Sequence, residues 1–188
     1  MASWHGYCIR VRGPGKIQVQ KTLGDCELLM KNQKGFSLIE LLIVVVIIGI
    51  IAAIAIPNLL AARRAANEGS AISAMRTLHG AQFTYASTYG AGNYAHAQVT
   101  LGGTLGLIDA TLASGTKSGY VWTGNATDFT GTTPATFWFS CIPTATSGVT
   151  ATGTRRFGMA TDGVIRSDTT LTQYANEAAV LAGSVYTP

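Results

Sequence analysis

The sequence predicts an α+β protein, in which one long N-terminal helix packs on a small antiparallel β-sheet. The first half of that helix is expected to be transmembrane and the second half to belong to a globular head. Two observations predict this class. An apolar run from Phe36 to Ile56 continues into an alanine-rich helical pattern. From Gly90 onward, glycine, threonine and serine alternate with short apolar runs, which is typical of a loop-rich β domain.

The apolar run is long enough to cross a bilayer. At a helical rise of about 1.5 Å per residue, Phe36 to Ile56 reaches about 30 Å, the thickness of one hydrocarbon core. Gly49 lies inside the run, Pro57 follows its end, and Lys31 and Lys34 stand just before it. Because basic residues stay on the cytoplasmic side, we expect a single-pass inner membrane protein with a cytoplasmic N-terminus.

Glu40 is the one charged residue of this run. A carboxylate at that depth costs roughly 2.5 to 3.5 kcal/mol on insertion scales, so it needs a partner or a function. One interpretation is that Glu40 stays protonated or reaches the interface. The other is that a cut between Gly35 and Phe36 creates an α-amino cation at the same depth. Glu40 would then pair with the amine of a neighbouring copy.

The stretch KGFSLIELLIVVVIIGIIAAIAIPNL resembles the N-terminal signature of the type IV pilin and pseudopilin family. The resemblance implies that a membrane aspartyl prepilin peptidase recognises Gly35, cuts after it and methylates the new N-terminus at Phe36. It also implies that Glu40, the fifth residue of the mature chain, acts in assembly. Gly49 and Pro57 fall where the helix of family members loosens and bends when subunits pack. No catalytic or metal-binding residue is implied.

The function implied is a structural subunit of a type IV pilus, polymerised from the inner membrane into an extracellular filament for adhesion, motility or DNA uptake. The implied partners are the prepilin peptidase, other copies of the chain, and the pilus or secretion machinery. A pseudopilin of a type II secretion system is the first alternative, and a membrane-anchored extracytoplasmic binding domain is the second. The sequence contains no G-x-S-x-G, P-loop or H-E-x-x-H motif, so we expect no enzyme.

Two other fates of the apolar run stay open. Ala53-Ile54-Ala55 would serve as the cleavage site of an ordinary secretory signal peptide. The run is longer than the usual apolar region of such a peptide and contains Glu40, and both features disfavour this reading. The run could also be a permanent anchor that is never cut, which only Glu40 and the Gly35-Phe36 junction disfavour.

The first 35 residues are expected to be removed on maturation. Because Met30 already begins a complete leader, we expect residues 1–29 to be a gene-model extension; a genuine long leader is the alternative. The leader carries a net charge of +4, as does the whole chain, so the mature part is neutral and no nucleic-acid partner is expected. The basic residues of the leader are Arg10, Arg12, Lys16, Lys21, Lys31 and Lys34, and its acidic residues are Asp25 and Glu27.

The mature chain is expected to have three parts. Residues 36–57 form the transmembrane and filament-core helix, residues 58–89 an amphipathic continuation of it, and residues 90–188 the β-rich head. We expect one helix from about residue 37 to residue 88. Several side chains in this continuation recur at about helical spacing, and we expect them to pack under the sheet. These residues are Ile72, Met75, Leu78, Gln82, Tyr85 and Tyr89. Arg63 and Arg64 are expected to meet lipid headgroups or acidic neighbours.

Within the head, a short helix is expected at residues 107–113, stopped by Gly115. Strands are expected at residues 119–123, 136–142, 156–160 and 163–167. A tight hairpin at Asp162-Gly163 would join the last two. Arg155 and Arg156 are expected to guard an edge strand against aggregation.

Few side chains of the mature part can bind a metal or react. Cys141 is its one cysteine, so no intramolecular disulfide is expected, and its apolar neighbours predict a buried core residue. His79 and His96 are its two histidines.

Calcium is a minor alternative that comes from the resemblance, since the major pseudopilin of type II secretion systems holds calcium in C-terminal loops. The candidate ligands are Asp162, Asp168 and Glu177. The turn already explains Asp162 and ordinary solvation explains Asp168, so no cofactor is expected.

Overall fold

The computed structural model describes residues 35–103 and 105–187. The expected leader lies outside this range except for Gly35. Contacts divide the chain into two compact units, with the boundary between Gly49 and Ile50.

Helix α1, Leu38–Thr88, confirms the expected long helix and contains Pro57. Its most apolar stretch has no buried residue. In the first unit, Ile39, Leu41 and Ile43 are all more than half exposed. By length and composition, α1 is able to cross a membrane.

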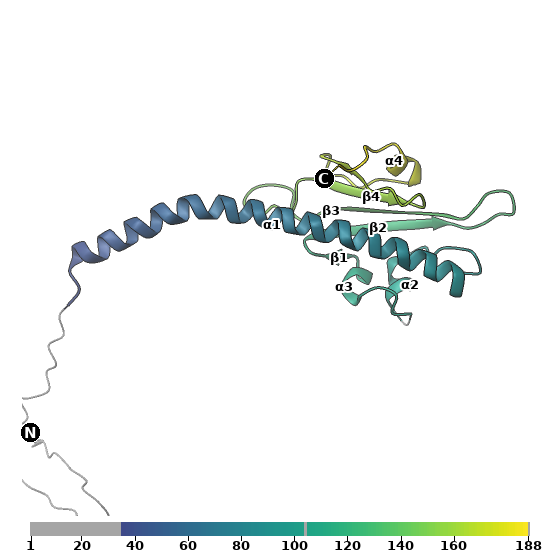
Figure 1. Ribbon diagram of the computed structural model, residues 1–188, viewed down its shortest axis with the longest axis horizontal. Helices are drawn as coiled ribbons and strands as arrows, with labels where there is room; N and C mark the ends of the chain where they lie inside the picture. Colours follow the sequence, from purple (N-terminus) through teal and green to yellow (C-terminus); the bar gives the residue numbers. More distant parts are fainter. Residues whose placement is uncertain (1–34, 104, 188) are drawn as a thin grey trace, which may run out of the picture. The chain divides into compact units, whose positions relative to one another are not determined.

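In the head, α1 buries one side against a β-sheet (Figure 1). Ile72, Met75, Leu78 and Gln82 are buried as expected. Tyr85 is only partly buried, and Tyr89 is 54% exposed, so the expectation is wrong there. The buried side therefore ends before the last turn of α1.

The sheet has five antiparallel strands in the order β1-β2-β3-β4-β5. The strands are β1 (Thr116–Lys117), β2 (Tyr120–Thr127), β3 (Thr136–Pro143), β4 (Arg156–Ala160) and β5 (Arg166–Asp168). β3 is the central strand, and its Phe137, Phe139 and Cys141 belong to the core cluster that includes Met75 and Leu78 of α1. Alternate residues of a strand point to one face, so this side of the sheet covers the helix.

A smaller cluster forms on the opposite face of the sheet. Helix α4, Glu177–Leu181, places Val180 beside Ala160 and Tyr174. Figure 1 shows α4 on the side of the sheet away from α1. Asn176 caps α4, since its side chain accepts a hydrogen bond from the backbone N–H of Ala179.

Two further short helices connect α1 to β1. They are α2, Gln98–Gly102, and α3, Ala110–Ala113. Each contributes one fully buried leucine, Leu101 and Leu112, to the main core. α3 confirms the expected short helix but begins later than residue 107, because the Asp109 side chain caps it by accepting from the N–H of Leu112.

Two strand expectations need correction. β2 extends four residues beyond the expected end at residue 123, because it pairs with β3 along its whole length. β5 starts at Arg166 instead of residue 163, so the connection at Asp162-Gly163 is a longer loop and not a tight hairpin. Arg166 holds Asp162 by two hydrogen bonds, and this contact shapes the loop.

Gly124 of β2 lies where no side chain fits. A Cβ at this position would stand 2.1 Å from a ring carbon of Phe139 and 2.7 Å from the carbonyl oxygen of Trp138. Because Phe139 is itself buried, Gly124→Ala is expected to lower the free energy of unfolding by about 3 kcal/mol. Denaturant unfolding of the full chain in detergent, followed by tryptophan fluorescence, measures this loss.

Gly69 provides the matched control in α1. A Cβ there meets no heavy atom within 4 Å. Gly69→Ala is therefore expected to stabilise the helix by about 0.5 to 1 kcal/mol. Equal unfolding midpoints for the two variants would contradict the close packing described at Gly124.

Candidate processing and assembly site

The expected cleavage site precedes the first turn of α1. Gly35, Phe36 and Ser37 have no regular secondary structure, and the helix begins at Leu38. The carbonyl of Ser37 accepts the N–H of Leu41 at 3.2 Å. Phe36 is 85% exposed. The peptide bond between Gly35 and Phe36 therefore lies in open backbone that a peptidase can bind without unwinding a helix.

Glu40 lies in the first turn of α1 and is exposed among apolar side chains. Its carboxylate is close to the positive end of the helix dipole, which favours a negative charge. Within residues 35–103 and 105–187, Glu40 makes no ion pair. The folded part of the chain thus leaves this carboxylate available to a group from elsewhere.

Gly49 and Pro57 are placed in α1 as the sequence predicts. A Cβ on Gly49 would meet no heavy atom within 4 Å, so the subunit fold itself does not require glycine there. Pro57 has no N–H to donate to the carbonyl of Ala53, so the helix lacks one bond at that turn. Their expected roles in bending and packing remain predictions.

The two arginines that follow the apolar run behave differently. Arg63 is exposed, and its expected contact with headgroups remains a prediction. Arg64 donates to the carbonyls of Gly148 at 2.9 Å and Ala151 at 3.3 Å. The expectation for Arg64 is wrong, because its guanidinium binds backbone of the head.

The expectation of an arginine guard at a sheet edge is also wrong. β4 lies between β3 and β5, so Arg156 is on an inner strand. Its guanidinium lies 3.9 Å from the centre of the Tyr174 ring and pairs with Asp168 at 2.9 Å. Arg155 pairs with Glu68 of α1 at 3.3 Å. Both arginines therefore join elements within the head.

The three acids considered for calcium have separate partners. Asp162 binds Arg166, Asp168 binds Arg156, and Glu177 accepts from the hydroxyl of Thr136 at 2.7 Å. Within the part of the chain that the structure describes, no group of three His, Cys, Asp or Glu side chains is arranged to hold a metal ion.

The Asp162–Arg166 pair predicts a loss of stability in acid. The Arg166 hydrogen bond holds the pKa of Asp162 below its ordinary value, while burial opposes this shift. A lowered folded pKa stabilises the fold above the unfolded pKa of about 4, and the contribution is lost as the pH falls through the folded value. Asp162→Asn is expected to cost about 2 kcal/mol at neutral pH, less than a fully buried pair because the carboxylate is partly exposed.

Unfolding of Asp162→Asn and of the unaltered chain at neutral pH and near pH 2 measures this effect. The difference in free energy of unfolding between the variant and the unaltered chain should be smaller near pH 2 than at neutral pH. Asp128→Asn is the control, because its contact with His96 is exposed on both sides and is expected to matter less. A difference that stays constant with pH would contradict the assignment to the charged pair.

Cys141 and His79 both contact the apolar core of the head. Cys141 is fully buried, as expected. Burial raises the pKa of its thiol far above its usual range, which keeps the thiol protonated and unreactive. His79 contacts the rings of Phe83 and Phe137, and its Nε2 lies 3.4 Å from the carbonyl oxygen of Thr161.

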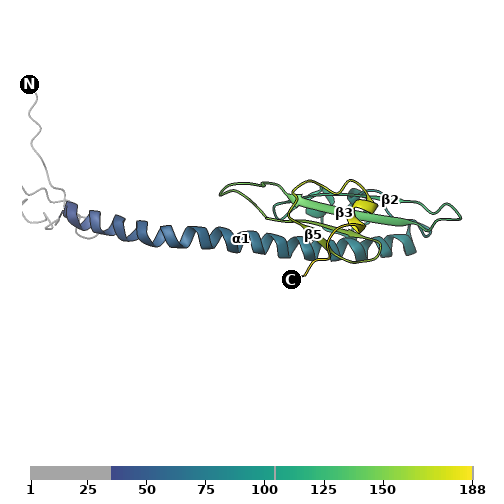
Figure 2. The same cartoon turned by 90° about the horizontal axis from the view of Figure 1, so that it is seen from above.

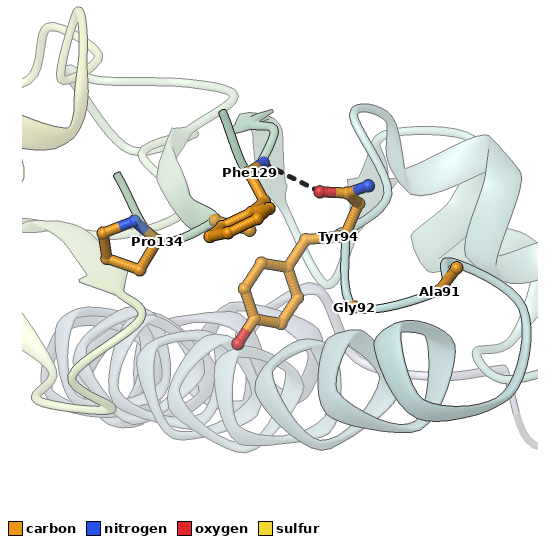
Figure 3. A pocket seen from close by; sticks show the side chains of 7 residues that line it. Ala91, Gly92, Tyr94, Phe129 and Pro134 are labelled. Carbon is orange, nitrogen blue, oxygen red and sulfur yellow. Dashed lines mark hydrogen bonds between the residues drawn. The ribbon is translucent and has the colours of Figure 1, made fainter. Parts of the chain in front are cut away.

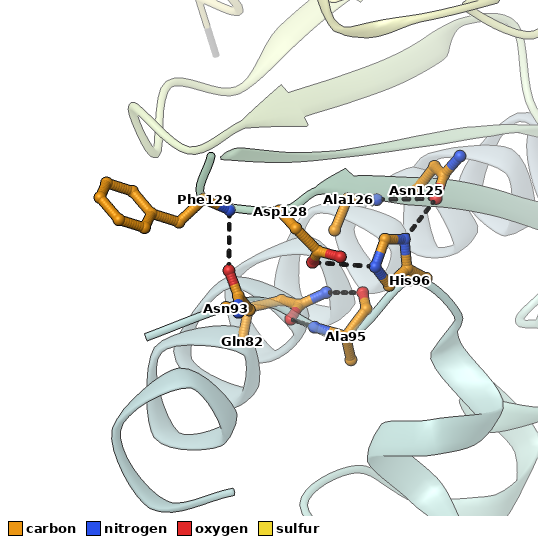
Figure 4. Close-up of polar contacts among 8 residues, drawn as sticks. All are labelled: Gln82, Asn93, Ala95, His96, Asn125, Ala126, Asp128 and Phe129. Atoms are coloured by element: carbon orange, nitrogen blue, oxygen red, sulfur yellow. Dashed lines mark hydrogen bonds and ion pairs between the residues drawn. The ribbon is translucent and has the colours of Figure 1, made fainter. Parts of the chain in front are cut away.

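A polar network fastens the loop after α1, and the sequence did not predict it (Figure 4). Buried Gln82 both donates to the carbonyl of Ala95 and accepts its N–H, each at 2.8 Å. His96 lies between Asp128, at 3.0 Å, and Asn125, at 3.3 Å. The oxygen of Asn125 also accepts the N–H of Ala126. These contacts join the loop to the end of β2.

A hollow of about 390 Å³ lies beside this network (Figure 3). Tyr94, Phe129 and Pro134 line it, and the N–H of Phe129 donates to the side chain of Asn93 at 2.8 Å. It contains no charged side chain among its lining residues. Its composition does not indicate catalysis.

Comparison with known proteins adds the deciding observation. Residues 30–56 match the prokaryotic N-terminal methylation motif. By this segment, the chain is similar to type IV pilins and pseudopilins. The match includes Gly35, Phe36, Glu40 and Gly49 and ends one residue before Pro57.

The curated relatives include pilus proteins and a protein of a type II secretion system. The major component of the type IV wide pilus of Thermus thermophilus is 69% identical over 39 residues, or 21% of this chain and 30% of the relative. Core protein G of the type II secretion system of Klebsiella pneumoniae is 36% identical over 56 residues, 30% of this chain and 40% of the relative. A fimbrial protein of Pseudomonas aeruginosa is 79% identical over 29 residues, 15% of this chain and 19% of the relative.

The similarity covers only part of each of these relatives. The chain covers between 19% and 40% of their lengths. No solved structure matches the chain significantly. The comparisons therefore concern a limited part of the chain, with the methylation motif at residues 30–56, and no solved structure adds to the description of the head.

Proposed function

We propose that the chain is a structural subunit of a type IV pilus. It is made as a prepilin, held in the inner membrane by residues 36–56 with its N-terminus in the cytoplasm, and cut between Gly35 and Phe36. The mature subunit, methylated at Phe36, then polymerises with other copies into an extracellular filament. The observation that carries this proposal is an exposed apolar segment, residues 36–56, whose one charged residue, Glu40, makes no ion pair within the described chain.

Assembly follows from the physical chemistry of this segment. In the membrane, the apolar side chains of α1 contact lipid, and in a filament they contact the same segment of other subunits. The exchange keeps them out of water in both states. The cut creates a cationic amine at Phe36, and Glu40 of a neighbouring subunit is its partner. Apolar packing then supplies cohesion, and the Glu40 pair sets the register between subunits.

A type II secretion pseudopilin is the second candidate, because the likeness to core protein G extends over 56 residues and so reaches beyond the methylation motif. Shearing of cells that express the chain at its native level distinguishes the two. Long surface fibres that contain the chain support the pilus. A processed chain that stays with the membrane, without long fibres, supports the pseudopilin, and an unprocessed chain contradicts both.

A further inference from the structure

The connection between β3 and β4 is a loop that is fastened along α1. Residues 144–154 form this loop, and none of them is charged. Arg64 donates to the carbonyls of Gly148 and Ala151, and Asn67 donates to the carbonyl of Thr152 at 2.8 Å. Three backbone carbonyls of the loop thus bind two side chains of one helix.

Glu68 fixes the C-terminal end of the loop. Its carboxylate is buried and accepts both the N–H and the hydroxyl of Thr154, at 2.8 and 2.7 Å. The pairing with Arg155 neutralises its charge. Hydrogen bonds to a charged group are stronger than neutral ones, so this end is firmly held.

The order of these contacts gives the loop a direction. Thr154 lies at Glu68, Thr152 at Asn67, and Gly148 at Arg64. The loop therefore approaches the N-terminal end of the head part of α1 as it reaches its tip at residues 147–150. Figures 1 and 2 show this connection beside α1. Val149, at the tip, is 72% exposed.

Arg63 and Arg64 mark the outer end of the uncharged segment. Between Glu40 and Arg63 the sequence contains no charged residue, and these 22 positions, 41–62, correspond to about 33 Å of helix. A bilayer core is about 30 Å thick, with polar headgroup layers of roughly 5 to 8 Å on each side. With residues 36–56 in the core, Arg63 follows the span by about 10 Å of helix, so its long side chain reaches back to the outer edge of the headgroup layer. The loop tip that Arg64 binds lies at the same edge.

We propose that the tip of the β3–β4 loop, residues 147–150, lies in the headgroup layer of a phospholipid bilayer while the subunit is stored in the membrane. Val149 buries apolar surface there, and the hydroxyls of Ser147 and Thr150 bond to headgroup oxygens. None of the four tip residues carries a charge that would have to be desolvated. Exposed Arg63 at the same level attracts lipid phosphate. This inference rests on the membrane-anchored stage of the proposed function and not on polymerisation.

A spin label at residue 149 tests the contact. Val149→Cys is made in a full-length chain whose Cys8, Cys26 and Cys141 are alanine, and it is reconstituted in vesicles of equal parts phosphatidylethanolamine and phosphatidylglycerol. The matched control is Val99→Cys, an exposed valine of α2. The collision rate of the spin label with oxygen, which concentrates in lipid, is compared with its collision rate with a water-soluble nickel complex. We expect the oxygen-to-nickel ratio to be several-fold higher at residue 149 than at residue 99.

Equal ratios at the two positions, in a chain that floats with the vesicles, would overturn the inference and leave the anchored stage intact. A chain that does not float would instead contradict the anchored stage itself. Spectral broadening at residue 149 that disappears on dilution with unlabelled subunit would place another copy at the tip and overturn the lipid contact. Arg64→Ala, which releases the tip, is expected to lower the ratio at residue 149 without loss of flotation.

Discussion

Replacing Glu40 by alanine is expected to abolish filaments and leave a processed subunit in the membrane. The variant lacks the carboxylate that would pair with the Phe36 amine of a neighbouring copy. Loss of one partner from a buried ion pair typically costs about 3 to 5 kcal/mol, which is more than a hundredfold in an association constant at each addition. Quantification of sheared fibres, together with the intact mass of the membrane-bound subunit, measures the two parts of this prediction.

Two companion variants separate charge from packing. Glu40→Gln keeps the shape of the side chain and removes its charge, so it is expected to fail as Glu40→Ala does. Ile39→Ala removes apolar surface beside it and is expected to reduce filaments only mildly. Normal filaments from Glu40→Ala would refute the pairing role.

Replacing Gly35 by valine is expected to block processing completely. A peptidase that recognises glycine before the cut has no room for a branched side chain. The fold is not the cause, because a Cβ at Gly35 meets no heavy atom within 4 Å. The variant should keep the mass of its leader and form no fibre, since the Phe36 amine is never released. Immunoblots and intact mass of membrane fractions give the result.

Gly69→Ala is the matched glycine control for this variant, because a Cβ at Gly69 also meets open space. It is expected to be processed normally. If Gly35→Val were cut at the same bond and at the same rate, Gly35 would not be the recognition residue. Cleavage after Ala55 in either variant would point to an ordinary signal peptide.

Long periodic segments of the fold were predictable from the sequence. The apolar run and the alanine-rich continuation predicted α1 nearly to its ends. Among the strands, the expected range 156–160 agrees with β4, and β3 exceeds its expected range by one residue. Both strands carry alternating or continuous apolar side chains, which are the local signal for burial in a sheet.

The short elements depend on contacts that are distant in the sequence. The two residues of β1 form a strand only because they pair with the start of β2. α2 has no capping side chain and is held by buried Leu101. α4 had a local signal that was missed, the Asn176 cap followed by the acidic Glu177.

The proposed processing and assembly site is one continuous motif, so the sequence alone is enough to propose it. Gly35, Phe36 and Glu40 stand at fixed spacing, and no tertiary contact is needed to recognise them. The contacts of Arg64 and Glu68 are different, because their partners lie more than 80 positions away in the β3–β4 loop. Only the fold brings these residues together.

Cleavage between Gly35 and Phe36 is the step on which the whole proposed function depends. Intact mass and N-terminal peptide mapping of the protein from its native membrane, or from sheared fibres, test it most directly. A mature chain that begins at N-methylated Phe36 is the result expected of a prepilin. A chain that retains Lys34-Gly35, or one that begins at Ile56, would contradict the account and indicate an anchored or secreted domain.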